Sequence, residues 1–230
     1  MARKSSAKAY FAASRTLAAS YVFVAPLFGL YQLGILFEPG ARSGTDPIYQ
    51  ELLHRFHRLG HVIVNLVLLG LLFLAIARTR KERTRISGLY ALMWVESCLW
   101  AALMLVAAHL VPFEALAIGP FARDLVSGAG AGIYEETLFR FLLMGGLILV
   151  LHRGLGGRPT WVVPLAIATS AFLFSWAHHT IGREPWSTQV FLFRAAMGVI
   201  LGWIYWVRGL GITIYTHALY NVVLVLERNV

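Results

Sequence analysis

Three short polar patterns stand out in a chain that is otherwise strongly apolar. Residues 135–140 read Glu-Glu-Thr-Leu-Phe-Arg, residues 174–179 read Phe-Ser-Trp-Ala-His-His, and residues 217–221 read His-Ala-Leu-Tyr-Asn. Each pattern lies in a hydrophobic stretch long enough for a membrane helix. Charged and titratable groups inside such stretches are costly and usually face a partner or a water-filled cavity. These residues are therefore the first candidates for chemistry.

The first pattern separates two neighbouring carboxylates. Glu136 and Arg140 are four residues apart, so they share one helix face and can form an ion pair. Glu135 is rotated by about 100° from Glu136 and faces a different neighbour. The ion pair would fix the helix in the bundle, and the free carboxylate of Glu135 could act as a general base. An ion-paired structural face explains the same three residues equally well.

The other two patterns also place side chains on common faces. Phe174 and His178 are four residues apart, which predicts that the aromatic ring packs against the imidazole. His217 and Asn221 have the same spacing. Because Asn does not titrate, Asn221 can only donate hydrogen bonds or orient a neighbour. The His217–Asn221 pair could stabilise an oxyanion or hold two helices together.

The ordered set of three motifs resembles the CAAX protease and bacteriocin-processing family (CPBP, also called ABI). This family contains the type II CAAX prenyl endopeptidases and related bacterial intramembrane proteases. The resemblance covers about residues 125–225. It implies an intramembrane endopeptidase that hydrolyses a peptide bond in a membrane-anchored protein, which is either prenylated or held by a transmembrane tail.

The resemblance also implies a role for each motif residue. Glu135 and His178 would hold and activate the water that attacks the scissile carbonyl. His217 and Asn221 would stabilise the oxyanion. The supporting residues would be Glu136, which could also assist at the water, together with Arg140 and Phe174.

A zinc site is the alternative use of the same groups. Glu135, His178 and His217 could bind zinc with one open water position. However, the sequence has no His-Glu-x-x-His motif, and the family that it resembles is viewed mainly as glutamate-dependent. We therefore expect no metal and no other cofactor.

Composition sets the fold class. The 230 residues are 58% hydrophobic and 13% charged, with a mean hydropathy of +0.68, whereas soluble domains carry about 25% charged residues. A membrane span needs about 20 apolar residues. We expect an all-α bundle of about seven transmembrane spans in one domain, 1–230, with an interfacial helix within 38–59. The expected spans are 16–37, 60–78, 87–110, 127–151, 161–179, 189–207 and 211–226.

The net charge of +9 has a membrane explanation. With a cytoplasmic N-terminus, twelve of the 20 Lys and Arg residues fall in inner segments and six in outer segments, which follows the positive-inside rule. The inner basic loops would face anionic lipid headgroups. We expect an integral protein of the bacterial inner membrane that binds no nucleic acid. The only cysteine, Cys98, excludes an internal disulfide.

Hydropathy leaves one geometric difficulty and one open pairing. His178 lies near the outer end of its span and His217 lies near the inner end of another, so their depths differ by more than about 10 Å at 1.5 Å per residue. They can meet only if helices tilt, kink or end inside the membrane. Glu96 and Arg194 belong to no motif; they could pair with each other, or Arg194 could extend its charged end to the membrane surface. Gly128/Gly132 and Gly198/Gly202 predict close helix contacts.

Two other functions could use the same buried polar groups. A small transporter would use them to line an ion path, although the two halves show no repeated broken helices. A non-catalytic scaffold would bind membrane-anchored partners without cutting them. The sequence predicts neither the substrate nor the oligomeric state.

Overall fold

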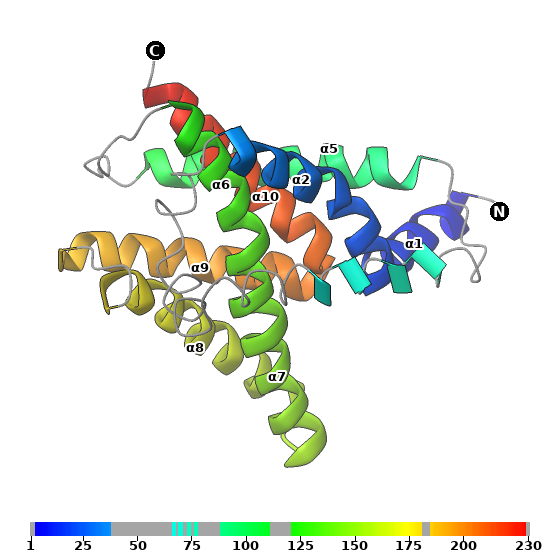
Figure 1. The fold of residues 1–230 in the computed structure, drawn as a ribbon. Coiled ribbons are helices and arrows are strands. Elements are labelled where there is room, and N and C mark those ends of the chain that lie inside the picture. Colours follow the sequence, from blue (N-terminus) through cyan, green and yellow to red (C-terminus); the bar gives the residue numbers. More distant parts are fainter. Residues whose placement is uncertain are drawn as a thin grey trace.

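The computed structural model describes residues 3–37, 88–110, 121–180 and 185–228, with a few positions between 66 and 77 (Figure 1). All regular structure in these residues is helical. The elements are α1 (Arg3–Ser14), α2 (Leu17–Phe37), α5 (Leu89–His109), α6 (Phe121–Glu135), η2 (Glu136–Met144), α7 (Gly145–Ile148), η3 (Leu149–Gly154), α8 (Pro159–Thr180), α9 (Thr188–Arg208) and α10 (Leu210–Arg228).

Five described helices are long and apolar enough to cross a membrane, namely α2, α5, α8, α9 and α10. Their bounds lie within about two residues of five expected spans, which confirms the polytopic all-α bundle. The expected interfacial helix at 38–59 lies outside the described residues. So does much of the expected span 60–78, where the described positions are helical.

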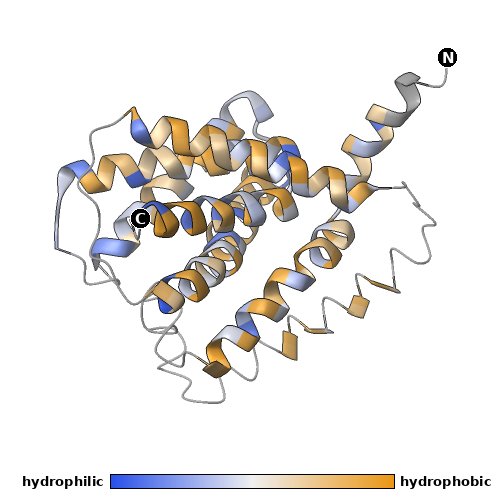
Figure 2. Cartoon of the chain, turned by 90° about the horizontal axis from the view of Figure 1, so that it is seen from above, coloured by the Kyte–Doolittle hydropathy of each residue, from blue (hydrophilic) through white to orange (hydrophobic). Residues whose placement is uncertain are grey.

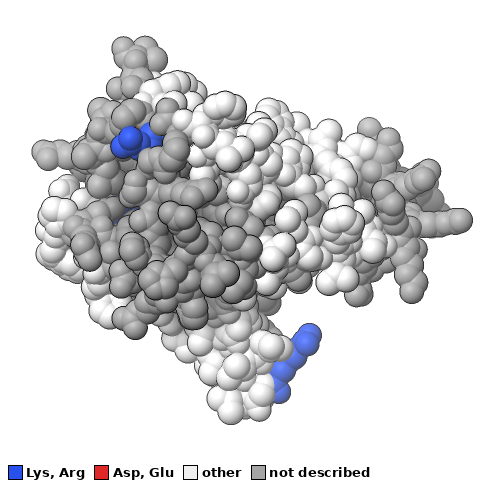
Figure 3. All heavy atoms as spheres, viewed as in Figure 1, with Lys and Arg blue, Asp and Glu red and all other residues white. Residues whose placement is uncertain are grey.

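The surfaces of these helices fit a lipid environment. One face of α5 carries five Leu and Val side chains that are each 50% or more exposed. They are Leu92, Val95, Leu99, Leu103 and Val106. Figure 2 shows hydrophobic residues along the outside of most helices, and Figure 3 shows a face whose described part carries few charged side chains. An exposed apolar stripe on this scale marks an interaction surface, and here the partner is the hydrocarbon of a bilayer.

Glycine allows two pairs of helices to approach closely. A Cβ placed on Gly132 would lie 2.9 Å from the Cβ of Ala218, and one placed on Gly198 would lie 3.1 Å from Ala171. The first contact joins α6 to α10, and the second joins α8 to α9. The expected role of the two Gly-x-x-x-Gly pairs is therefore confirmed. The α6–α10 contact matters most, because both helices carry motif residues.

The helix that carries Glu135 differs from the prediction. The expected span was 127–151, whereas helical structure begins at Phe121 and continues to Gly154. Within this run, η2 and η3 are π-helical. Residue spacing alone does not reveal such a change, because it depends on partners from other helices. One partner is Ser170 of α8, whose hydroxyl donates to the Phe139 carbonyl at 2.8 Å.

Glu96 pairs with Arg208 and not with Arg194, so the proposed Glu96–Arg194 pair is wrong. Arg208 donates to both carboxylate oxygens of Glu96, with one Nη2–Oε2 distance of 2.7 Å. Tyr10 of α1 donates to the same carboxylate at 2.6 Å, and burial together with this carboxylate raises the pKa of Tyr10 to about 12. This cluster was not predicted from the sequence, because α1 and α9 meet only in the folded bundle. The cluster fastens α1 to the end of α9.

Candidate active site

The carboxylate of Glu135 lies between two imidazoles. Its Oε1 is 3.7 Å from His178 Nε2, and its Oε2 is 4.0 Å from His217 Nε2. The Glu135 and His217 residues are each 6% exposed. Three residues from α6, α8 and α10, far apart in sequence, thus converge on one small polar site inside an apolar bundle. Both distances are longer than a direct hydrogen bond.

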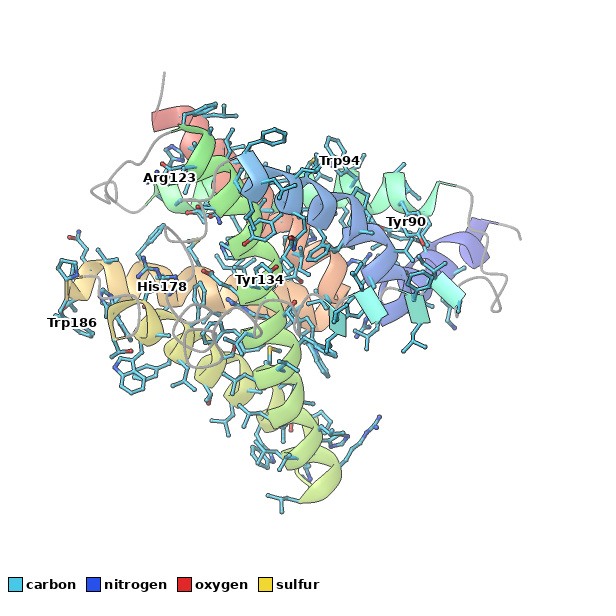
Figure 4. The ribbon with its side chains drawn as sticks, viewed as in Figure 1. Tyr90, Trp94, Arg123, Tyr134, His178 and Trp186 are labelled. Carbon is cyan, nitrogen blue, oxygen red and sulfur yellow. The ribbon has the colours of Figure 1, made fainter. Side chains whose placement is uncertain are left out.

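The ring of His178 is held from two sides. Its Nδ1 lies 2.9 Å from the Phe174 carbonyl, which can only accept a hydrogen bond, so Nδ1 is the protonated nitrogen of the neutral ring. The Phe174 ring packs edge-on against the imidazole with centroids 4.9 Å apart, as the spacing predicted. This arrangement turns Nε2, with its lone pair, toward Glu135. Figure 4 labels His178 near the end of α8.

His217 is oriented in a similar way by Glu136. Its Nδ1 is 2.7 Å from Glu136 Oε1, and the same oxygen is 3.1 Å from Arg140 Nη1. The predicted Glu136–Arg140 ion pair is therefore present, and both side chains are 0% exposed. Glu136 binds two neighbours and directs His217 Nε2 toward Glu135. The two adjacent glutamates thus have different surroundings, as their rotation around the helix predicted.

Arg140 connects three helices around this site. Its Nη2 donates to the Gly198 carbonyl of α9 at 3.2 Å. Its guanidinium also lies over the Phe174 ring of α8, 4.5 Å from the centroid. A buried cation in this position lowers the cost of burying Glu136 and helps to hold α8 and α9 against the site.

The structure brings His178 and His217 to the same carboxylate, in spite of the different depths expected along their spans. The run from α6 to η3 crosses α8 and α9 instead of lying parallel to them (Figure 1). Its 34 residues are well above the roughly 20 that span a hydrocarbon core of about 30 Å. A bundle with strongly inclined helices no longer relates depth simply to position along each span.

The contact of Asn221 is with the backbone of α6 and not with another motif side chain. Asn221 lies one turn beyond His217 on α10, and its Nδ2 donates to the Gly128 carbonyl of α6 at 3.4 Å. The bond is long, and Asn221 is half-buried. The structure thus places Asn221 on the α6–α10 contact next to the site. A role in stabilising an oxyanion remains a prediction.

Two contacts around the site were not predicted from the sequence. Ser170 binds the backbone of η2 at Phe139, and Gly198 supplies the carbonyl that Arg140 binds. A serine within an apolar helix was the available signal for the first. A backbone carbonyl gives no sequence signal at all.

Among the described residues, no group of three His, Cys, Asp or Glu side chains is arranged to hold a metal ion. The independence of the site from metals remains a prediction.

Fold and site together define a polytopic helical membrane protein with a buried carboxylate–imidazole centre. Residues 117–223 match the family described as Type II CAAX prenyl endopeptidase Rce1-like. The matched region contains all three motifs and confirms the family resemblance. Comparisons with curated proteins and with solved structures found no match.

Proposed function

We propose that this protein is an intramembrane endopeptidase that hydrolyses a peptide bond in a membrane-anchored protein. The observation that carries the proposal is the position of the Glu135 carboxylate, within 4.0 Å of Nε2 of both His178 and His217. The match of residues 117–223 to a family of prenyl endopeptidases supports the same activity.

Glu135 and His178 are suited to hold the attacking water. Both the carboxylate and the lone pair of His178 Nε2 are hydrogen-bond acceptors. A water molecule can donate one O–H group to each, and the 3.7 Å between them leaves room for such a bridge. During attack on the scissile carbonyl, Glu135 takes a proton from the water. It then delivers this proton to the leaving amine, so that water and peptide become a carboxylic acid and an amine.

His217 is suited to stabilise the oxyanion in its charged form. When Nδ1–H donates to Glu136, neutral His217 has no proton on Nε2. A second proton gives an imidazolium whose Nε2–H can donate to the oxyanion. The Glu136 carboxylate holds the ring in this orientation through Nδ1, as the buried Asp does for the His of a serine protease. Glu136 is thus a positioning residue, and Asn221 would supply the second donor.

The substrate follows from the membrane setting. A site between inclined apolar helices is reached by a segment that is itself in the bilayer, so we propose a prenylated protein or one with a transmembrane tail. We further propose a bacterial inner membrane and a cytoplasmic N-terminus, which the distribution of basic residues favours.

The direct test is cleavage in proteoliposomes. The purified protein is incubated with a farnesylated C-terminal peptide and, separately, with a transmembrane-tailed reporter, and new termini are identified by mass spectrometry. We expect cleavage of one substrate by wild type and none by Glu135→Ala. Substrate binding without cleavage by wild type would favour a scaffold, and ion flux without cleavage would favour a transporter.

Metal chelation gives a second prediction. The proposed chemistry needs a carboxylate, two imidazoles and an amide, so activity should change less than about twofold after prolonged dialysis against a strong chelator. Turnover before and after dialysis is the measurement. Loss of activity with selective recovery on addition of zinc would show that Glu135, His178 and His217 act as metal ligands.

Asn221→Ala tests the proposed oxyanion site. A donor that acts in the transition state contributes to kcat and little to KM, and loss of one such donor costs roughly 10²–10³ in kcat. We expect a decrease of this size with a nearly unchanged KM. Asn221→Asp should be at least as harmful, because its carboxylate repels the developing negative charge. A normal kcat together with a lower Tm would instead assign Asn221 to the contact with Gly128.

A further inference from the structure

Arg194 is a charged residue within the apolar helix α9, and it belongs to none of the three motifs. It is half-buried, and its Nη1 atom is buried. Glu96, its expected partner, binds Arg208 instead. A charged residue inside an apolar span is costly and usually faces a partner or a water-filled cavity. The position of Arg194 in the bundle therefore indicates which partner it serves.

Helices α8 and α9 lie side by side and run in opposite directions (Figure 1). Two close approaches fix their register. A Cβ placed on Gly202 would lie 3.2 Å from the Ile167 side chain, and one placed on Gly198 would lie 3.1 Å from Ala171. Four residues back along α9 thus correspond to four residues forward along α8, which is about one helical turn.

The next turn of this register brings Arg194 opposite the turn of α8 that ends at His178. A hydrogen bond agrees with this alignment, because the Ser175 hydroxyl donates to the Phe191 carbonyl of α9 at 2.8 Å. Arg194 also shares a face of α9 with Gly198, whose carbonyl is bound from η2 at the site. Arg194 therefore lies on the side of α9 that faces the site.

Among the described residues, the charges of the site balance when Arg194 is included. Glu136 and Arg140 are 3.1 Å apart and neutralise each other. With both imidazoles neutral, Glu135 would remain as an unbalanced negative charge inside an apolar bundle, which is costly. The positive charge of Arg194 acts on the Glu135 carboxylate. Two carboxylates thus meet two guanidinium groups.

We propose that Arg194 is the charge partner of Glu135 and holds its carboxylate in place between the two imidazoles. Arg194 is thus a positioning residue, which acts on the reaction through Glu135. Its effect on hydrolysis rests on the proposed function, whereas the charge pair does not. Because the interaction is one of charge, the point charge of a lysine can replace the guanidinium.

The first test measures the charge pair without any substrate. It compares the Tm of the full chain in detergent for wild type, Arg194→Gln, Glu135→Gln and the double variant. Arg194→Gln leaves the buried Glu135 carboxylate uncompensated, so Tm should fall by at least about 4 °C. Arg153→Gln, at an exposed position of the run from α6 to η3, is the control and should leave Tm unchanged.

The same substitution should have no effect on Tm when Glu135 is already replaced. Glu135→Gln alone should keep the wild-type Tm, because the half-buried Arg194 can then extend its charged end toward the membrane surface. The double variant should also keep it, because no buried carboxylate is left without its partner. The loss of stability in Arg194→Gln is therefore expected only while Glu135 carries its charge.

The second test is turnover of a substrate that wild type cleaves. Arg194→Gln should lower kcat at least about tenfold and change KM less than about twofold, because a displaced base slows the reaction without weakening substrate binding. Arg194→Lys keeps the charge and should recover kcat to within about threefold of wild type. If wild type cleaves no substrate, the proposed function fails, while the Tm comparison still decides the charge pair.

Three results would overturn the proposal. The first is an unchanged Tm for Arg194→Gln. The second is the same loss of Tm whether or not Glu135 is replaced, which would make Arg194 a packing residue. The third is a higher KM with a normal kcat that disappears when the C-terminal carboxylate of the substrate is amidated, which would assign Arg194 to substrate binding.

Discussion

Glu135→Gln is expected to abolish peptide hydrolysis while the protein stays folded. Glutamine keeps the size of the side chain but cannot take a proton from water. General-base catalysis contributes about 10²–10⁴ to a rate, so we expect kcat to fall at least 10²-fold. Folding should be preserved, because Glu135 lies 3.7 and 4.0 Å from its two imidazole neighbours and forms no short ion pair with either of them.

The measurement is kcat and Tm on the same detergent preparation. Glu136→Gln is the informative comparison, because it removes the neighbouring carboxylate, which binds Arg140 and His217. It should lower Tm as well as activity, whereas Glu135→Gln should lower activity alone. Near-normal turnover by Glu135→Gln at neutral pH would transfer the role of base to Glu136.

Much of the fold could be predicted from the sequence, because the bilayer imposes a simple rule on the chain. An apolar stretch of about 20 residues is long enough to span, and α2, α5, α8, α9 and α10 follow this rule to within a few residues. The close contacts of Gly132 and Gly198 were also predicted, because small residues four apart allow helix backbones to approach.

The remaining features depend on contacts between distant helices. The π-helical η2 segment is bound by Ser170 of α8, and Glu96 is paired with Arg208 of α9. Neither partner is near in sequence, so no local pattern identifies it. Depth along a span was also a poor guide, because it assumes parallel helices, whereas the run from α6 to η3 crosses α8 and α9 (Figure 1) and both His178 and His217 lie near Glu135.

Within the site, spacing predicted the face of each residue better than its partner. The four-residue intervals placed Glu136 with Arg140 and Phe174 with His178, and both pairs are in contact. The contact of Glu136 with His217 was not predicted, because it joins two helices. It explains how one carboxylate can orient the imidazole while its neighbour, Glu135, is available as the base.

Arg140→Ala should destabilise the protein strongly. Arg140 and Glu136 are both fully buried and 3.1 Å apart, and removing one partner of a buried ion pair costs about 3–5 kcal/mol. The variant also loses the bond to the Gly198 carbonyl and the contact with the Phe174 ring. We expect a much lower folded yield and a lower Tm in detergent. Arg153→Ala, at an exposed position of the same helical run, should match wild type.

The double variant Glu136→Gln/Arg140→Leu separates charge burial from function. It removes both buried charges, so it should recover part of the stability lost in Arg140→Ala. It should not recover activity, because it removes the carboxylate that binds Nδ1 of His217 and orients its ring. Unfolding free energy and kcat measured on wild type, on both single variants and on the double variant test both expectations. A stable Arg140→Ala protein would contradict the buried pair, and an active double variant would show that His217 needs no carboxylate behind it.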